Sequence, residues 1–240
     1  MASTTTVKIQ DTLNWCFAYI LGRVSSGAGG FTNEPGLTNA NLILSTILAP
    51  PFAWSWNRFT DNSTSTVKGT QDYAVSLQTF GWLEKASLTD ANGKEWELEL
   101  YGLESKESVQ ARPRNIVVFK DDNNGNITFR LFPVPDGVYT LTLTYQKAPP
   151  LAATLGTTTW TPIPDKLAFL YERAMLAQLH AIYDTTAYLQ ELQIFFRQLV
   201  GAAEGLTETE KALFLEDSLR YAKTSSMALQ ATQASPKRGA

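Results

Sequence analysis

The side chains that could carry out catalysis are few in this sequence and lie far apart along it. His180 is the only histidine and Cys16 the only cysteine, which excludes paired-histidine catalysis, an intramolecular disulfide and a cysteine-rich metal site. We interpret His180 as a surface or interface residue of a helix, and Cys16 as a buried structural thiol. The sequence therefore predicts no catalytic residue, no metal ligand and no cofactor, and a protein that is not an enzyme.

Three further patterns have a chemical and a structural interpretation. The glycine-rich run 26–30 lacks the Gly-Lys-Ser/Thr of a phosphate loop. The run 121–126 is rich in aspartate and asparagine, but it has neither the spacing of an EF-hand nor its closing glutamate, so we predict a solvated hairpin turn. Glu95, Glu97 and Glu99 alternate along one predicted strand, which indicates a wet sheet face more often than the carboxylate pair of a glycoside hydrolase.

An aromatic group opens the middle of the chain. Its members could line a carbohydrate site, although a sheet core or a subunit contact is the more common use of such residues. They are Phe52, Trp54, Trp56 and Phe59. A ligand- or carbohydrate-binding β-module with a helical attachment region therefore stays open as an alternative function.

Length and charge narrow the class of protein. The chain has 240 residues, with 44% hydrophobic and 18% charged residues, which suits one large or two small globular domains. Its net charge is −3 and its basic residues are scattered, which argues against a surface built to neutralise nucleic-acid phosphates. The apolar run 13–21 is too short to span a bilayer, so we predict a protein without a membrane segment.

The two ends of the chain have helical patterns. Apolar residues recur at helical spacing over 7–25, and a second short helix is predicted over 40–48, with Asn39 as its N-cap and two prolines after it. After residue 150 three more helices are predicted. They begin near Pro164, near residue 187 and at Thr207, where Glu210 completes a capping box. The apolar stripe expected on the last helix consists of Ala212, Leu215, Leu219 and Ala222.

The middle of the chain has the two-residue period of strands. Five strands are predicted, over 73–78, 95–100, 115–120, 127–131 and 138–146, with turn residues between them. In the last strand Leu141, Leu143 and Tyr145 face one way, and threonines face the other. In the second, Leu98 and Leu100 should face inward with Trp96.

These elements predict an α+β fold. An antiparallel β-sandwich or barrel-like domain is inserted between an N-terminal helix and a C-terminal helical bundle. The expected divisions are N-terminal helices packing with the C-terminal bundle, a β-domain, the helical bundle and an extended C-terminal arm: 1–50, 51–150, 151–223 and 224–240.

The stretch 129–150, FRLFPVPDGVYTLTLTYQKAPP, resembles a signature of phage head-to-tail adaptors of the tail tubular protein A type. In that family a strand ends in a Phe-Pro-x-Pro turn, and an alternating strand follows. The matching residues here are Phe132, Pro133, Pro135, Tyr139, Leu141, Leu143, Tyr145 and Pro149. The family's Ile-Pro-Asp before a helix is matched by Ile163, Pro164 and Asp165.

The resemblance implies a structural virion protein that is assembled in the host cytoplasm. Such adaptors form homo-oligomeric rings, usually of twelve subunits, between the portal protein and the tail tube or nozzle protein, and double-stranded DNA passes through the lumen. Their helices and C-terminal segments face the portal, and their β-domains face the tail.

Two surfaces are predicted on this basis. The apolar stripe of the last helix fades before its predicted end, so the segment beyond is expected to order on a partner. The expected portal-binding residues are Arg220, Lys223, Met227, Leu229, Gln230, Lys237 and Arg238. The expected tail-facing loop comprises Asp121, Asp122, Asn123 and Asn124.

Overall fold

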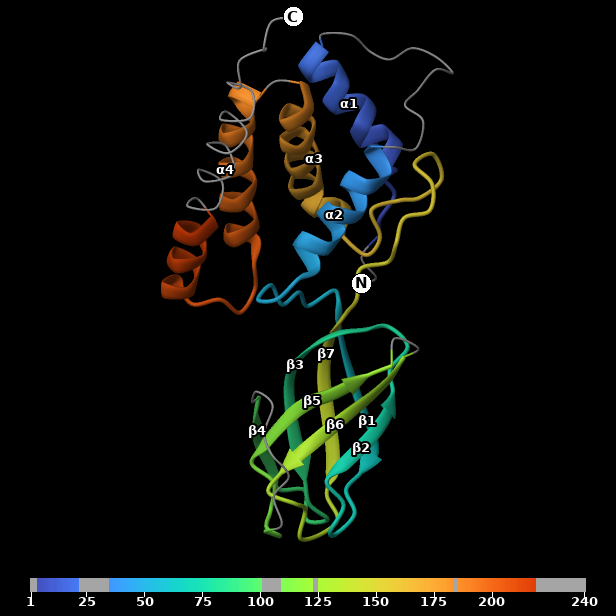
Figure 1. Cartoon of the computed structure of the whole chain (residues 1–240), viewed down its shortest axis with the longest axis vertical. Helices are drawn as coiled ribbons and strands as arrows, with labels where there is room; N and C mark the ends of the chain where they lie inside the picture. Colours follow the sequence, from blue (N-terminus) through green and yellow to red (C-terminus); the bar gives the residue numbers. More distant parts are fainter. Residues whose placement is uncertain (1–3, 22–34, 101–108, 123–124, 184, 219–240) are drawn as a thin grey trace, which may run out of the picture. The chain divides into compact units, whose positions relative to one another are not determined.

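The structure, a computed structural model, describes residues 4–21, 35–100, 109–122, 125–183 and 185–218. The chain divides into two compact units, each shown in Figure 1. One comprises residues 1–52 and 149–240 and is helical; the other comprises residues 53–148 and is built from β-strands. The fold is therefore α+β with a barrel-like sheet between flanking helices, as the sequence predicts.

The helical unit is arranged around α3 (Ala168–Tyr183), which contacts α1 (Ile9–Leu21), α2 (Gly36–Leu48) and α4 (Thr185–Ala202). The short helix η1 (Asp165–Leu167) leads into α3, and residues 208–218 are also helical. Because neighbours cover α3 on several sides, an almost continuous run of its residues is buried: Leu170, Tyr171, Ala174, Met175, Leu176, Ala177 and Leu179. None of the helices in the described ranges is long and apolar enough to cross a membrane.

The prediction that Asn39 caps the second helix is wrong. α2 begins at Gly36, three residues earlier, so Asn39 lies inside the helix and is buried. Gly36 packs closely against α1, since a Cβ at this position would lie 2.8 Å from a methyl carbon of Leu13. The predicted end is confirmed: α2 stops at Leu48, before Pro50.

The β-unit is a seven-stranded, nearly closed sheet among the described residues. Its strands follow the order β1-β7-β3-β4-β5-β6-β2, and all neighbours are antiparallel except β4 and β5. The bounds are β1 (Arg58–Ser65), β2 (Asp72–Ser76), β3 (Phe80–Thr89), β4 (Glu95–Leu100), β5 (Asn115–Asp121), β6 (Asn126–Phe132) and β7 (Thr140–Lys147).

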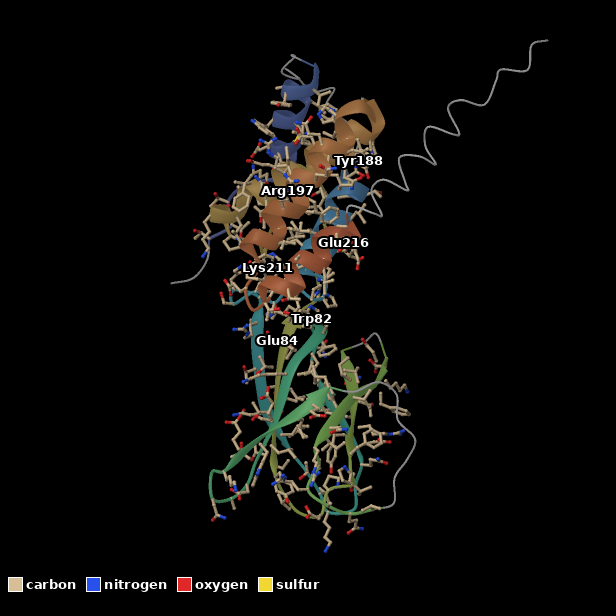
Figure 2. All side chains as sticks on the ribbon, turned by 90° about the vertical axis from the view of Figure 1, so that its left-hand side faces the viewer. Trp82, Glu84, Tyr188, Arg197, Lys211 and Glu216 are labelled. Atoms are coloured by element: carbon tan, nitrogen blue, oxygen red, sulfur yellow. The ribbon has the colours of Figure 1, made fainter. Side chains whose placement is uncertain are left out.

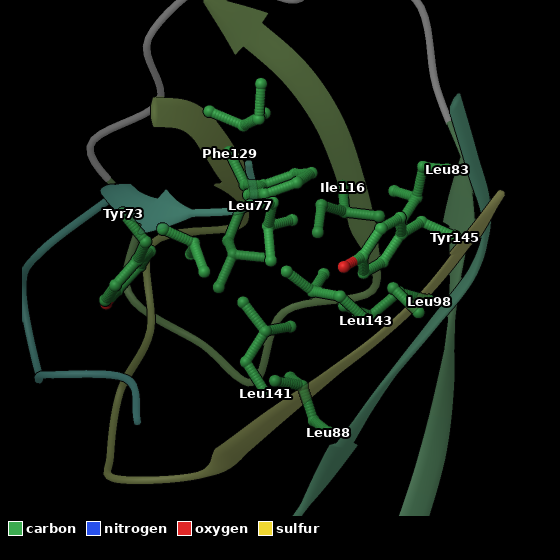
Figure 3. Close-up of a cluster of buried hydrophobic side chains, with 14 residues drawn as sticks. Tyr73, Leu77, Leu83, Leu88, Leu98, Ile116, Phe129, Leu141, Leu143 and Tyr145 are labelled. Carbon is green, nitrogen blue, oxygen red and sulfur yellow. The ribbon is translucent and has the colours of Figure 1, made fainter. Parts of the chain in front are cut away.

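One apolar cluster fills the inside of this sheet (Figure 3). Leu141, Leu143 and Tyr145 of β7 all belong to it, which confirms the predicted facing of that strand. Leu98 is buried as predicted, but the inward placement of Leu100 is wrong, since this side chain is 47% exposed. The pairing of β4 with β3 ends at Leu98, so Leu100 lies at the rim of the cluster instead of beneath a neighbouring strand.

The sequence does not predict two of the strands, β1 and β3. β1 is polar and mostly exposed, because it is an edge strand that pairs only with β7. β3 has a long pairing with β7, interrupted by two register shifts that break its alternation of apolar and polar residues. Gly81 is required at the first shift, since a Cβ there would lie 2.8 Å from the backbone nitrogen of Ala148.

Candidate functional site

The helix at 208–218 begins with the predicted capping box. The backbone N–H of Thr207 donates to the Glu210 carboxylate at 2.8 Å, and the N–H of Glu210 donates to the Thr207 hydroxyl at 3.3 Å. Hydrogen bonds from the Thr207 hydroxyl and N–H keep the pKa of Glu210 below its ordinary value. Two otherwise unpaired N–H groups are thus satisfied at the helix start.

The packed face of this helix differs from the prediction. Its main contact is Phe214, whose ring lies edge-on to Phe52 at 4.9 Å and also meets Phe196 at 6.0 Å. Leu215 is half-buried, but Ala212 is exposed, so the predicted stripe is wrong at that position. The large ring of Phe214 sets which face turns inward. Lys211 and Glu216 mark the helix in Figure 2.

The residues expected to bind the portal lie beyond the described part of the chain. These are Arg220, Lys223, Met227, Leu229, Gln230, Lys237 and Arg238. What the structure does show is the segment that precedes them, held to the helical unit through Phe214.

The acidic turn at 121–126 is a hairpin connection between β5 and β6. Asp122 accepts hydrogen bonds from both the backbone N–H and the side-chain amide of Asn126, at 3.0 and 2.8 Å. Gly125 has φ of +85°, and its carbonyl accepts the N–H of Leu77 at 2.7 Å. Asp121 is exposed, and Asn123 and Asn124 fall outside the described residues. The turn lies at the end of the sheet where the chain enters at β1 and leaves at β7.

Four connections gather at the opposite end of the sheet, which we call the loop end. They are residues 66–71, 90–94, 109–114 and 133–139. Strand pairing brings them together, because the end of β1 and the end of β3 both meet the start of β7, and the start of β5 meets the end of β6. These strand ends lie at the bottom of the sheet in Figure 1.

Backbone hydrogen bonds hold the loop end together. The N–H of Gly69 donates to the carbonyl of Pro135 at 2.9 Å, and the N–H of Ala111 donates to the carbonyl of Val134 at 3.0 Å. Thr66 bridges the first and last connections, since its hydroxyl donates to the carbonyl of Gly137 and accepts the N–H of Tyr139. The loops are therefore fixed to one another and not only to their own strands.

Trp96 lies at the centre of a side-chain cluster at the loop end. The guanidinium of Arg112 lies 4.7 Å from the centroid of its ring and the ammonium of Lys94 lies 5.3 Å from it. The ring of Tyr139 meets it edge-on at 6.2 Å, and the Tyr139 hydroxyl donates to Asp136 at 2.8 Å. These cation–π contacts bring two positive charges, one from each of two connections, to the same aromatic ring.

The sequence matches the family described as SU10 adaptor protein over residues 44–225. That span contains the whole β-unit and most of the helical unit, well over half of the chain. The chain belongs to this family of phage head-to-tail adaptors. No curated protein matches the sequence.

The reactive side chains of this adaptor-family chain are buried. Cys16 is fully buried and lies 3.7 Å from the carbonyl oxygen of Glu172. Burial raises the pKa of its thiol to about 12, which confirms a structural thiol and leaves it without nucleophilic thiolate at neutral pH. His180 is also buried, so its interpretation as a surface residue is wrong, because α3 is covered by its neighbours. Within the described ranges no acidic, histidine or cysteine side chains group as metal ligands.

The aromatic group and the β4 glutamates, considered above as possible carbohydrate-binding or catalytic residues, make structural contacts or face solvent. Phe52 contacts Phe214, Trp54 stacks on Trp56 at 5.4 Å, and Phe59 lies under the ammonium of Lys147 at 3.3 Å. The aromatic group is thus divided among separate contacts. Glu95, Glu97 and Glu99 are all exposed, which confirms the wet sheet face.

Proposed function

We propose that this adaptor-family chain forms a homo-oligomeric ring of twelve copies between the portal protein and the tail tube or nozzle protein of a phage virion. The observation that carries the proposal is the family match across both units. Copies of one chain form a closed ring when two different surfaces of each subunit meet head to tail. Assembly in the host cytoplasm, before release of the virion, belongs to the same proposal.

Double-stranded DNA passes through the lumen of this ring without sequence-specific binding. The net charge of −3 supports this role, because a mildly negative wall does not trap the phosphate backbone as a basic surface would. The chain acts as a structural component and performs no catalysis in this role.

The helical unit faces the portal, and residues from about 220 to 238 form the portal-binding arm. Many arms in one ring bind together, since every contact after the first is effectively intramolecular. The tail-facing role of Asp121, Asp122, Asn123 and Asn124 stays a prediction. Replacing the two aspartates by asparagine would weaken attachment of the tail if that role is correct, and would leave it unchanged otherwise.

Sedimentation velocity of the full chain, alone and mixed with the portal protein of the same phage, tests the proposal. We expect a complex in which about twelve copies bind one portal ring. A chain that stays monomeric and does not sediment with the portal would contradict it.

Truncation after Lys223 tests the arm separately. The shortened chain should keep the unfolding midpoint of the full chain, yet lose stable attachment to DNA-filled heads. A matched truncation after Pro236 removes only the basic pair and the last two residues, and it separates their charge from the rest of the arm. Full attachment after the longer truncation would exclude the arm while leaving the adaptor role intact.

A further inference from the structure

Three of the four connections at the loop end carry basic residues. Lys68 lies in the first and Lys94 in the second, and Arg112 and Arg114 both lie in the third; residues 133–139 contain none. None of these basic residues has an ion-pair partner among the described residues. The sheet topology therefore brings several positive charges to one end of the sheet. Within the described residues these charges form no ion pairs.

The acidic side chains of the same connections accept hydrogen bonds from residues close to them in the sequence. Asp90 accepts the backbone N–H groups of Asn92 and Lys94, each at 2.9 Å, which closes the β3–β4 turn. Asp136 accepts the Tyr139 hydroxyl. Among the described residues of these connections, four cations thus stand against two carboxylates, and the exposed carboxylate of Glu95 follows Lys94 at the start of β4. The described connections are therefore locally positive, whereas the whole chain has a net charge of −3.

Apolar side chains are also exposed in these connections. Val67, Val109 and Val138 are 57%, 63% and 69% exposed, and each belongs to a different connection. Exposed apolar groups rimmed by charge are typical of a surface that another protein covers. Valines make no contribution to the phosphate contacts of a nucleic-acid site, so their exposure favours a protein partner.

The loop end is also rigid enough to bind without a large ordering cost. The hydrogen bonds from Gly69 to Pro135 and from Ala111 to Val134 fix three of its connections. Stacking on Trp96 holds Arg112 and Lys94 in place, and the Nε of Arg112 is buried without a hydrogen-bond partner in the described structure. Loops that are ordered before binding lose less conformational entropy when a partner docks.

We propose that the loop end is a docking surface for an acidic face of another protein. The partner's carboxylates pair with Lys68, Lys94, Arg112 and Arg114, and its apolar side chains cover the exposed valines. Such a partner is defined by its surface chemistry, and the contact does not require that the chain form a ring. It places the contact at the end of the sheet opposite the acidic turn at 121–126.

A fluorescent synthetic peptide in which glutamates alternate with leucines and serines is the probe for this surface. Its binding to the full chain is measured by anisotropy at low and at moderate salt. The same peptide with glutamine in place of glutamate, and a short DNA duplex, serve as the comparison probes. We expect the acidic peptide to bind most tightly and to weaken as salt rises, because exposed charge pairs are screened.

The main variant is Lys68→Glu with Arg114→Glu, because both side chains are exposed and neither supports the fold. It should weaken binding of the acidic peptide by about tenfold or more. Arg112→Gln should weaken binding as well, with a small loss of stability from the Trp96 contact. The matched control is Lys85→Glu with Lys120→Glu, two exposed strand lysines outside the four connections, and it should change affinity by less than about twofold.

Three outcomes would overturn the proposal. One is that the acidic peptide does not bind, or binds the Lys68→Glu, Arg114→Glu variant with unchanged affinity. Another is tighter binding of the DNA duplex with the same sensitivity, which would make the surface a nucleic-acid site. The last concerns Glu104 and Glu107, which lie outside the described residues. If the acidic peptide binds only after both are replaced by glutamine, the chain's own carboxylates occupy the cations and no partner is required.

Discussion

Trp160 stacks flat on Tyr171, with ring centroids 4.6 Å apart and planes inclined by 7°. The indole N–H of Trp160 also donates to the hydroxyl of Thr12 at 2.8 Å, and all three side chains are buried. One tryptophan therefore ties α1 and α3 to the segment that leads from the β-unit back into the helices. This contact fixes the helical unit, although the residues are separated by up to 159 positions in the chain.

Thr12→Val should destabilise the chain by about 1–3 kcal/mol, because it leaves the indole N–H of Trp160 buried without an acceptor. The valine has nearly the same shape, so packing changes little. Thr12→Ser keeps the hydroxyl and should cost less than the valine. Urea unfolding measures both, and equal costs for the two variants would show that the hydrogen bond contributes nothing.

Leu143→Ala should cost about 2–5 kcal/mol, because it opens a cavity in the cluster of Figure 3. Thr142 lies on the other face of β7 and is half-buried, so Thr142→Lys should be tolerated far better. Chemical unfolding of the two variants compares the faces of one strand. If Leu143→Ala and Thr142→Lys lower the free energy of unfolding by the same amount, the assigned facing of β7 is wrong.

Asp165 should make the stability of the helical unit depend on pH in the acid range. Hydrogen bonds from the hydroxyl and backbone N–H of Thr6, and from the N–H of Val7, hold the pKa of its carboxyl below the ordinary value. A group with a lowered folded pKa stabilises the fold above its unfolded pKa, and this contribution disappears as the pH falls through the folded pKa.

Asp165→Asn should therefore be less stable than the parent chain near neutral pH, and the difference should shrink on acidification. Thermal unfolding across the acid range measures this difference. Lys166→Gln, which changes the exposed neighbour, controls for the loss of a charge. A difference that stays constant with pH would exclude the carboxylate as its source.

The thiol of Cys16 should react with a thiol reagent at mildly alkaline pH only after the chain unfolds. It is fully buried, and its pKa of about 12 leaves almost no thiolate in the native state. Labelling followed by mass spectrometry, with and without denaturant, tests this. Rapid labelling of the native chain would mean that the α1–α3 contact opens readily.

The β-unit could be predicted wherever a strand has one buried face. The sequence predicts the bounds of β4 and the facing of Leu141, Leu143 and Tyr145 in β7, because apolar and polar residue types alternate along both strands. β1 and β3 could not be predicted, since an edge strand and a strand with register shifts do not show that alternation. His180 was misplaced because helical spacing does not show how many neighbours will cover a helix.

The loop end could not be predicted from the sequence. Lys68, Lys94, Arg112 and Arg114 are scattered along the chain, and only the pairing of β1, β3 and β5 with their neighbours brings them together. The acidic turn at 121–126 is the charged cluster that the sequence does show, because its charges are adjacent along the chain. The available signal is the presence of basic residues in three of the four turn-forming segments.

The measurement that tests the adaptor account most directly is a cryo-electron-microscopy reconstruction of the neck of the virion that carries this chain. We predict a ring of about twelve copies between portal and tail, with the helical unit on the portal and the β-unit toward the tail. The density should show the loop end in contact with an acidic protein surface. A neck in which this chain is absent, or in which it binds neither the portal nor the tail, would contradict the account.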